Sequence, residues 1–492
     1  MKIGFDNEKY QTIQSEHIKE RISQFDGKLY LELGGKLFDD HHASRVLPGF
    51  QPDSKLRMFQ KISDSIEIVI VISAADIEKN KKRADLGITY DEDVLRLRGE
   101  FQGRGFMVGS VVITHYNGQP AAIAFRQRLE RDGIKTYCHY LIEGYPHNVA
   151  LIASDEGFGK NDYVKTERPL VIVTAPGPGS GKMAVCLSQL YNENKRGVRA
   201  GYAKFETFPV WNLPLKHPVN IAYEAATADL NDVNMIDPFH LEAYGETTVN
   251  YNRDVEIYPV LKAIFTKIYG DCPYKSPTDM GVNMAGNCIS DDEVCRRASE
   301  QEIIRRYYKE LANIKRGTGS RDALKKLESL MKQAGVSPEN RSVVQPALVR
   351  EEVSGGPACA LQLPDGRIVT GKTSDQLSAS SAVLLNALKE MAGIPHAGHH
   401  VIAPEALAPI NALKKDYLGD RDSRLHLSET LIALTMSAQT NPEAARALEQ
   451  MPKIHGLDFH STVLITADDE AVLRKLRVNA TCEPKTEGGK LF

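Results

Sequence analysis

The chain has 492 residues, which at about 150 residues per domain predicts about three domains. It carries 61 lysine and arginine residues against 64 aspartate and glutamate residues, a formal charge of −3, and 42% of its residues are hydrophobic. This balance excludes global disorder, and it supplies no basic surface for nucleic acid.

The first part of the chain alternates helical and strand patterns. A helix is predicted over 15–25, and a compact apolar strand over 28–33 that ends in a double glycine. Further strands are predicted at 65–72, 107–115, 134–142 and 169–174, and further helices at 120–132 and 182–194. Such alternation is typical of an α/β layer, so residues 1–220 are predicted to form an N-terminal α/β domain.

The character of the sequence changes after about residue 220. Helical patterns at 221–229, 255–269, 291–315 and 321–335 follow one another, with apolar residues at three-four spacing such as Leu324 and Leu327. They predict a helical middle domain over 221–345, and the polar run up to Pro357 is interpreted as a linker.

The C-terminal part returns to strand patterns. Predicted strands at 358–363 and 367–370 are joined by a Pro-Asp-Gly turn, which predicts a hairpin. Residues 346–492 are therefore predicted to form a C-terminal three-layer α/β domain, and the whole chain is predicted to be a multidomain α/β protein.

The termini and the cysteines predict the compartment. No apolar segment follows the N-terminal lysine, and no window reaches 18 uncharged apolar residues, so neither a signal peptide nor a membrane span is expected. The seven cysteines are scattered and include no CxxC pair, which favours a reducing compartment and argues against a structural zinc. We expect a cytoplasmic protein without membrane or nucleic-acid partners.

The most informative stretch is PLVIVTAPGPGSGKMA, in which a buried strand runs into a glycine loop that ends in lysine at a helix N-terminus. Glycines permit positive φ and turn backbone N–H groups inward, while the helix dipole and the lysine add positive charge. The pattern predicts a phosphate-binding loop made of Gly177, Gly179, Ser180, Gly181 and Lys182. The alternative interpretation is a tight turn whose glycines only permit close packing.

This stretch resembles the Walker A loop of P-loop NTPases, with two departures. Pro176 stands in place of the first glycine, and Met183 stands where a serine or threonine would bind Mg²⁺. The following strand carries Lys204, which is similar to the P-loop subgroup of dethiobiotin synthetase, where a lysine in that place approaches the phosphates. The resemblance covers 169–205 and implies a nucleoside triphosphate with Mg²⁺ as the cofactor. No obvious Walker B motif follows this segment in the sequence.

The segment DLNDVNMIDPFHLE at 229–242 is dense in possible metal ligands. Asp232, Asp237 and His240 are the predicted ligands of Mg²⁺ or Mn²⁺, since hard cations prefer carboxylate oxygens. His240 is also a candidate catalytic base, together with Lys182 and Lys204 as catalytic cations. A solvated loop between helices would have the same composition.

Three weaker motifs complete the set. The double glycine at 34–35 is superficially like the glycine turn of amino-acid kinases, and Asp39 to His42 would either bind a metal or cap a helix. His396, His399 and His400 would ligate a metal only if the intervening glycine and proline allowed a helix.

Residues 358–393, a hairpin followed by an alanine-rich helix, are similar to the opening of the cytidine deaminase fold. Those enzymes place a zinc ligand and a glutamate at the start of the helix, where this chain has Ser380-Ser381-Ala382. No PCxxC motif follows. The comparison therefore implies a topology and argues against deamination.

Over its full length, with segments such as LELGGKLFDDHHASRVLPGF, APGPGSGKMA and TGKTSDQLSASSA, the chain resembles a family of bacterial proteins of this length and of unknown function. The resemblance implies an α/β N-terminal part, a helical middle, an α/β C-terminal part and a cytoplasmic location. It transfers no reaction and no catalytic residue.

Three functional hypotheses follow. The first is an enzyme that binds a nucleotide or a phosphorylated small molecule and performs kinase-like or ligase-like chemistry, which needs mainly positioning and positive charge. The second is a non-catalytic regulatory protein that forms homo-oligomers and in which the glycine loop is structural. The third is a metal-dependent hydrolase.

Overall fold

The computed structural model describes residues 2–34, 37–38, 40–83, 86–396, 398–420 and 422–487. The chain forms two compact units. Residues 2–223 and 232–295 make up the first, called here the N-terminal unit, and residues 224–231 and 296–492 make up the second, called the C-terminal unit. Each is described by itself.

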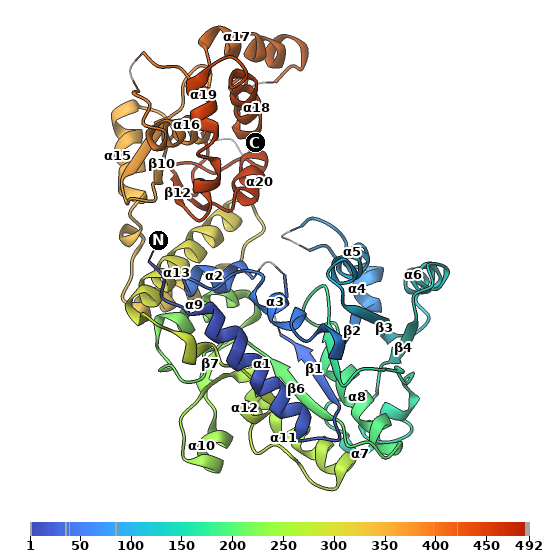
Figure 1. Ribbon diagram of the computed structural model, residues 1–492. Coiled ribbons are helices and arrows are strands. Elements are labelled where there is room, and N and C mark those ends of the chain that lie inside the picture. The colour runs from blue at the N-terminus through green and yellow to red at the C-terminus, as the bar shows by residue number, and fades with distance from the viewer. Residues whose placement is uncertain are drawn as a thin grey trace. The chain divides into compact units, whose positions relative to one another are not determined.

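The N-terminal unit is built on a seven-stranded sheet in the order β4-β3-β2-β5-β1-β6-β9, in which all neighbouring strands are parallel (Figure 1). The strands are β1 (Leu29–Leu33), β2 (Ile66–Ser73), β3 (Met107–Tyr116), β4 (Thr136–Tyr140), β5 (Leu170–Thr174), β6 (Gly201–Phe205) and β9 (Gly281–Val282). β2 and β5 are buried along their whole length, which explains why they are almost continuously apolar.

Helices cover both faces of this sheet. One face packs against α1 (Asn7–Ser23), α3 (Ser54–Gln60), α5 (Tyr90–Gly103) and α6 (Pro120–Arg131), and the other against α8 (Lys182–Lys195) and α11 (Asn252–Tyr269). Within β1, Leu29 and Leu31 belong to the first core and Tyr30 to the second, because successive side chains of a strand point to opposite faces.

Shorter elements complete the N-terminal unit and its chain connections. They are α2 (His41–Val46), α4 (Ala74–Glu78), α7 (Val149–Ile152), α9 (Pro218–Ala226), α10 (Pro238–Tyr244), α12 (Pro277–Met280), and the antiparallel pair β7 (Asn234–Ile236) and β8 (Val249–Tyr251). The strands and helices predicted for residues 1–220 are thus present, and the α/β class is confirmed.

The C-terminal unit has a four-stranded sheet in the order β11-β10-β12-β13. β10 (Ala358–Gln362) is antiparallel to β11 (Ile368–Lys372) and to β12 (Asp458–Ser461), while β13 (Asn479–Cys482) is parallel to β12. The predicted hairpin is confirmed. The helices are α13 (Asp292–Lys315), α14 (Arg321–Ala334), α15 (Val344–Ser354), α16 (Ala379–Met391), α17 (Pro404–Ala412), α18 (Leu427–Ser437), α19 (Pro442–Leu448) and α20 (Ala467–Lys475).

The segment interpreted as a linker contains a helix instead. α15 occupies 344–354 and buries Val344 and Ala347, because these two residues supply an apolar face that the surrounding polar residues conceal in the sequence. The residues of the predicted helical middle domain, 221–345, are divided, with 221–223 and 232–295 in the N-terminal unit and 224–231 and 296–345 in the C-terminal unit. Three domains with boundaries at 220 and 345 stay a prediction.

No helix within the described parts of the chain is long and apolar enough to cross a membrane.

Candidate functional site

The connections that leave β1 and β5 run in opposite directions across the sheet. β1 and β5 are neighbours, yet the chain leaving β1 continues to β2 on one side, and the chain leaving β5 continues to β6 on the other. Since crossovers are right-handed, the two connections lie on opposite faces of the sheet. In open α/β sheets, ligands bind beyond the carboxyl ends of strands at such a switch point.

The predicted glycine loop lies at this switch point, between the end of β5 and the start of α8. Gly179 and Gly181 have φ values of 73° and 88°, a left-handed conformation that favours glycine. Gly177 faces the ring of Tyr90, so that a Cβ there would collide with the tyrosine hydroxyl. The conformation of the loop therefore favours glycine at 179 and 181, and the close approach of Tyr90 favours it at 177.

Several polar groups of the loop lack partners. Gly181 is the N-cap of α8 and supplies no side-chain cap, so the N–H groups of the first helical turn have no intrahelical acceptor. Ser180 is 1% exposed, and its hydroxyl has no hydrogen-bond partner among the described residues, although its carbonyl accepts a hydrogen bond of 2.5 Å from Thr114. The half-buried Lys182 makes no ion pair with any residue that the structure describes.

A second set of polar residues lies at the same edge of the sheet and is called here the carboxylate cluster. It consists of Glu32 on β1, Lys204 on β6, Glu206 directly after β6, and Asp254 in the first turn of α11. The Lys204 amine lies 2.5 Å from the Asp254 carboxylate and 2.8 Å from that of Glu206. The three carboxylates are between 6% and 8% exposed.

Burial and charge act against each other in this cluster. Burial disfavours the charged lysine, but the carboxylates of Asp254 and Glu206 outweigh it and raise the pKa of Lys204. Burial raises the pKa of Glu206 to about 7, with Lys204 acting in the opposite direction. Lys204 is thus compensated by acidic residues of its own chain. Its predicted contact with phosphates stays a prediction, whereas Lys182 has no acidic partner among the described residues.

The predicted metal ligands each have a structural role. Asp232 is buried and forms an ion pair with Arg253, at 2.6 Å between Oδ1 and Nε. Asp237 is completely buried, caps α10, and accepts hydrogen bonds from the backbone N–H groups of Phe239, His240 and Thr278 and from the Thr278 hydroxyl.

His240 contacts Ser276 at 3.0 Å through Nδ1. Across the described ranges, no group of three or more histidine, cysteine or acidic side chains is arranged to hold a metal ion. The metal site at Asp232, Asp237 and His240 stays a prediction without a preassembled set of ligands.

The weaker motifs fall into ordinary structural positions. Asp40 caps α2 and pairs with Lys55 at 2.8 Å, which fits the capping interpretation of this motif, while Asp39 lies outside the described residues. His396 and His399 each pair with a glutamate. Gly34 donates its N–H to the carbonyl of Phe205, and Gly35 lies outside the described residues.

In the C-terminal unit, Ser380 and Ser381 begin α16 as the comparison with cytidine deaminases implied, and Ser378 caps that helix. A cavity of about 40 Å³ lies beside them and is lined by residues including Ser461 and His426. Its small volume leaves room for little more than a water molecule.

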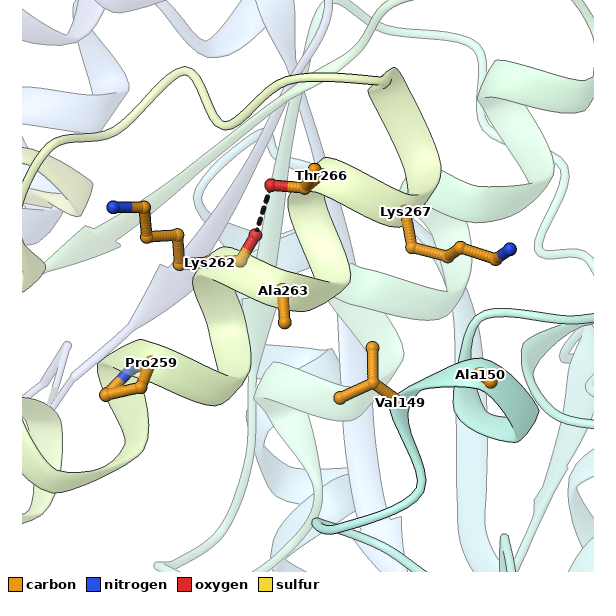
Figure 2. A pocket seen from close by; sticks show the side chains of 7 residues that line it. All are labelled: Val149, Ala150, Pro259, Lys262, Ala263, Thr266 and Lys267. Atoms are coloured by element: carbon orange, nitrogen blue, oxygen red, sulfur yellow. Dashed lines mark hydrogen bonds between the residues drawn. The ribbon is translucent and has the colours of Figure 1, made fainter.

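A larger hollow of about 550 Å³ lies between α7 and α11 of the N-terminal unit. Figure 2 shows Val149 and Ala150 on one side, and Lys262 and Lys267 extending in opposite directions from α11. None of the predicted site residues lines this hollow. Because its two lysines are exposed and its remaining surface is mostly apolar, it offers no fixed polar group to orient a ligand.

Sequence reasoning missed three members of the carboxylate cluster, namely Glu32, Glu206 and Asp254. One signal was present: Glu32 interrupts the apolar run LYLEL, and a charged residue within a buried strand needs a partner. The partners themselves come from β6 and α11, which the sequence does not place beside β1.

Comparison with known proteins identifies relatives over the whole chain. The family model described as "Domain of unknown function DUF1846, N-terminal" matches residues 3–335, and its C-terminal counterpart matches residues 339–492. A UPF0371 protein of Streptococcus thermophilus is 56% identical over 491 residues, and one of Streptococcus pneumoniae is 55% identical; both alignments cover 100% of this chain and 99% of the relative. The chain belongs to this uncharacterised bacterial family, DUF1846 (UPF0371).

Proposed function

We propose that the protein is an enzyme that binds a nucleotide or another phosphorylated small molecule through the loop at 175–182 and performs phosphoryl-transfer or ligase-type chemistry. The observation that carries this proposal is the placement of the loop. It joins a central parallel strand to the uncapped N-terminus of α8, at the topological switch point of the sheet.

The chemistry of the loop suits an anion. The free N–H groups of the first turn of α8 and its dipole favour negative charge, and Lys182 adds a full positive charge without a competing carboxylate among the described residues. The Ser180 hydroxyl is a further donor, with no partner in the part of the chain that the structure describes. These groups position and neutralise a phosphate, which is the main requirement of phosphoryl transfer.

The cofactor under this proposal is a nucleoside triphosphate with Mg²⁺. Met183 cannot ligate the cation, and Asp237 already accepts four hydrogen bonds. Phosphate oxygens and water would therefore supply most of the ligands of Mg²⁺.

A thermal-shift experiment tests the proposal with ATP, GTP, inorganic phosphate and sugar phosphates, each with and without Mg²⁺. At least one of these ligands should raise the Tm of the wild type, because a ligand at 100 times its Kd stabilises the folded state by about 2.7 kcal/mol. Lys182→Ala should weaken that ligand at least tenfold, because the variant loses the only full positive charge assigned to the loop.

Lys262→Ala is the matched control, since Lys262 is an exposed lysine of α11 and lies in the hollow of Figure 2 rather than in the loop. It should respond as the wild type does. The proposal is wrong if no phosphate compound stabilises the wild type, or if Lys182→Ala responds in the same way as the control.

A further inference from the structure

The glycine loop and the carboxylate cluster have opposite charges and occupy the same edge of the sheet. We propose that the site takes a phosphorylated ligand that also carries an amino group, with the phosphate on the glycine loop and the ammonium group beside Glu32 and Glu206. This inference rests on the proposed function and names its class of ligand.

The carboxylate cluster carries more negative than positive charge. Among the described residues it contains three carboxylates and one lysine, and each carboxylate is more than nine-tenths buried. Buried charges are costly unless they are paired, so a lone lysine leaves negative charge to be compensated by a proton or by a cation from outside. A protonated amine supplies that cation.

Each of the Glu206 and Glu32 carboxylates uses only one of its two oxygens. Both contacts of the Glu206 carboxylate, with Lys204 at 2.8 Å and with the Tyr251 hydroxyl at 3.2 Å, are made by Oε1. The Glu32 carboxylate accepts a hydrogen bond from Tyr202 through Oε2 alone. Within the described residues, Glu206 Oε2 and Glu32 Oε1 have no partner, yet neither is completely sealed from solvent. Two carboxylate oxygens are thus open to a donor.

The carboxylate cluster and the glycine loop lie close enough together for one ligand. Glu32 pairs with Val173 of β5 on one side and with Lys204 of β6 on the other. Glu206 and the start of the loop each lie two residues beyond these partners, at the same level of the sheet edge. Two strand spacings separate them, about 10 Å, with β1 in between. One small ligand can therefore reach both halves.

Gly34 lies beside Glu206 and carries no side chain to cover it. A Cβ at Gly34 would lie 2.7 Å from the Phe205 carbonyl oxygen and 3.6 Å from Glu206 Cγ. A side chain at this position would cover the Glu206 carboxylate from the side of β1, and glycine places none there. The double glycine singled out in the sequence thereby contributes Gly34 to the same site.

The experiment compares matched ligands that differ in one amino group. Glucosamine 6-phosphate is compared with glucose 6-phosphate, and ethanolamine phosphate with ethyl phosphate, by titration calorimetry of the full chain at pH 7. In at least one pair, we expect the wild type to prefer the amino compound tenfold or more. Glu206→Gln should reduce that preference to less than threefold, and Lys182→Ala should weaken both members of the pair equally.

Glu256→Gln, an exposed glutamate of α11, is the control and should keep the wild-type preference. If both members of each pair bind equally well to the wild type, or if Glu206→Gln keeps the preference, the inference is overturned while the proposed function stands. If none of these four compounds binds while ATP, GTP or inorganic phosphate does, the inference is likewise overturned and the proposed function stands. If no phosphate compound, nucleotides included, binds to the wild type, the proposed function fails and the inference fails with it.

Discussion

Replacement of Asp237 by alanine is expected to lower the free energy of unfolding by about 3–4 kcal/mol. The Asp237 carboxylate is completely buried and accepts four hydrogen bonds, of which two cap α10 and two hold Thr278. The substitution leaves those donors without an acceptor in a region from which water is excluded. Urea unfolding followed by circular dichroism measures the loss.

The same variant separates the cap from the metal ligand predicted at this position. If Asp237 is a helix cap, a chelator should leave the Tm of the wild type unchanged. Asp237→Asn keeps one acceptor oxygen and should therefore lose less stability than Asp237→Ala. His240→Ala should cost far less than either, because His240 makes its side-chain hydrogen bond at the edge of this region. Metal in the purified protein that disappears in Asp237→Ala, with stability retained, would contradict the structural role.

The Glu206→Gln variant is expected to gain stability relative to the wild type as the pH rises from 5 to 8. Burial raises the pKa of Glu206 to about 7 in the folded chain, whereas an unperturbed glutamate titrates near 4.3. Between these values the folded state binds more protons than the unfolded state, so the stability of the wild type falls as the pH rises. Glutamine has no proton to lose, and the relative gain should approach about 2–3 kcal/mol above pH 7.

Urea unfolding at closely spaced pH values measures this difference. Glu256→Gln should give a curve parallel to that of the wild type, because Glu256 is exposed. Parallel curves for Glu206→Gln as well would mean that Glu206 is ionised throughout this range, which would contradict a pKa raised to about 7.

Local chemistry was predictable from the sequence where one continuous segment contains all of it. The strand at 170–174, the loop and the start of α8 follow each other directly, and the positive φ values of Gly179 and Gly181 are what a tight strand-to-helix turn requires. The buried strands of the sheet were equally visible, since parallel strands with both faces covered need continuous apolar runs.

The strand order was not predictable in this way, because pairing depends on segments that are far apart in the chain. Glu32 and Lys204 are directly opposite each other although they are separated by most of the N-terminal unit. Composition also fails to distinguish a ligand from a cap: Asp237 precedes Pro238, and an aspartate followed by proline is equally typical of a helix start.

The division of the chain into two units restricts how the protein can be cut for study. Residues 224–231 belong to the C-terminal unit although they interrupt the sequence of the N-terminal one. The boundary between the two family models, after residue 335, lies C-terminal to α13 and α14. Most residues of these two helices belong to the C-terminal unit. A fragment that starts at residue 339 would therefore lack two helices of its own unit, and we expect it to aggregate unless residues 224–231 and 296–335 are supplied in trans.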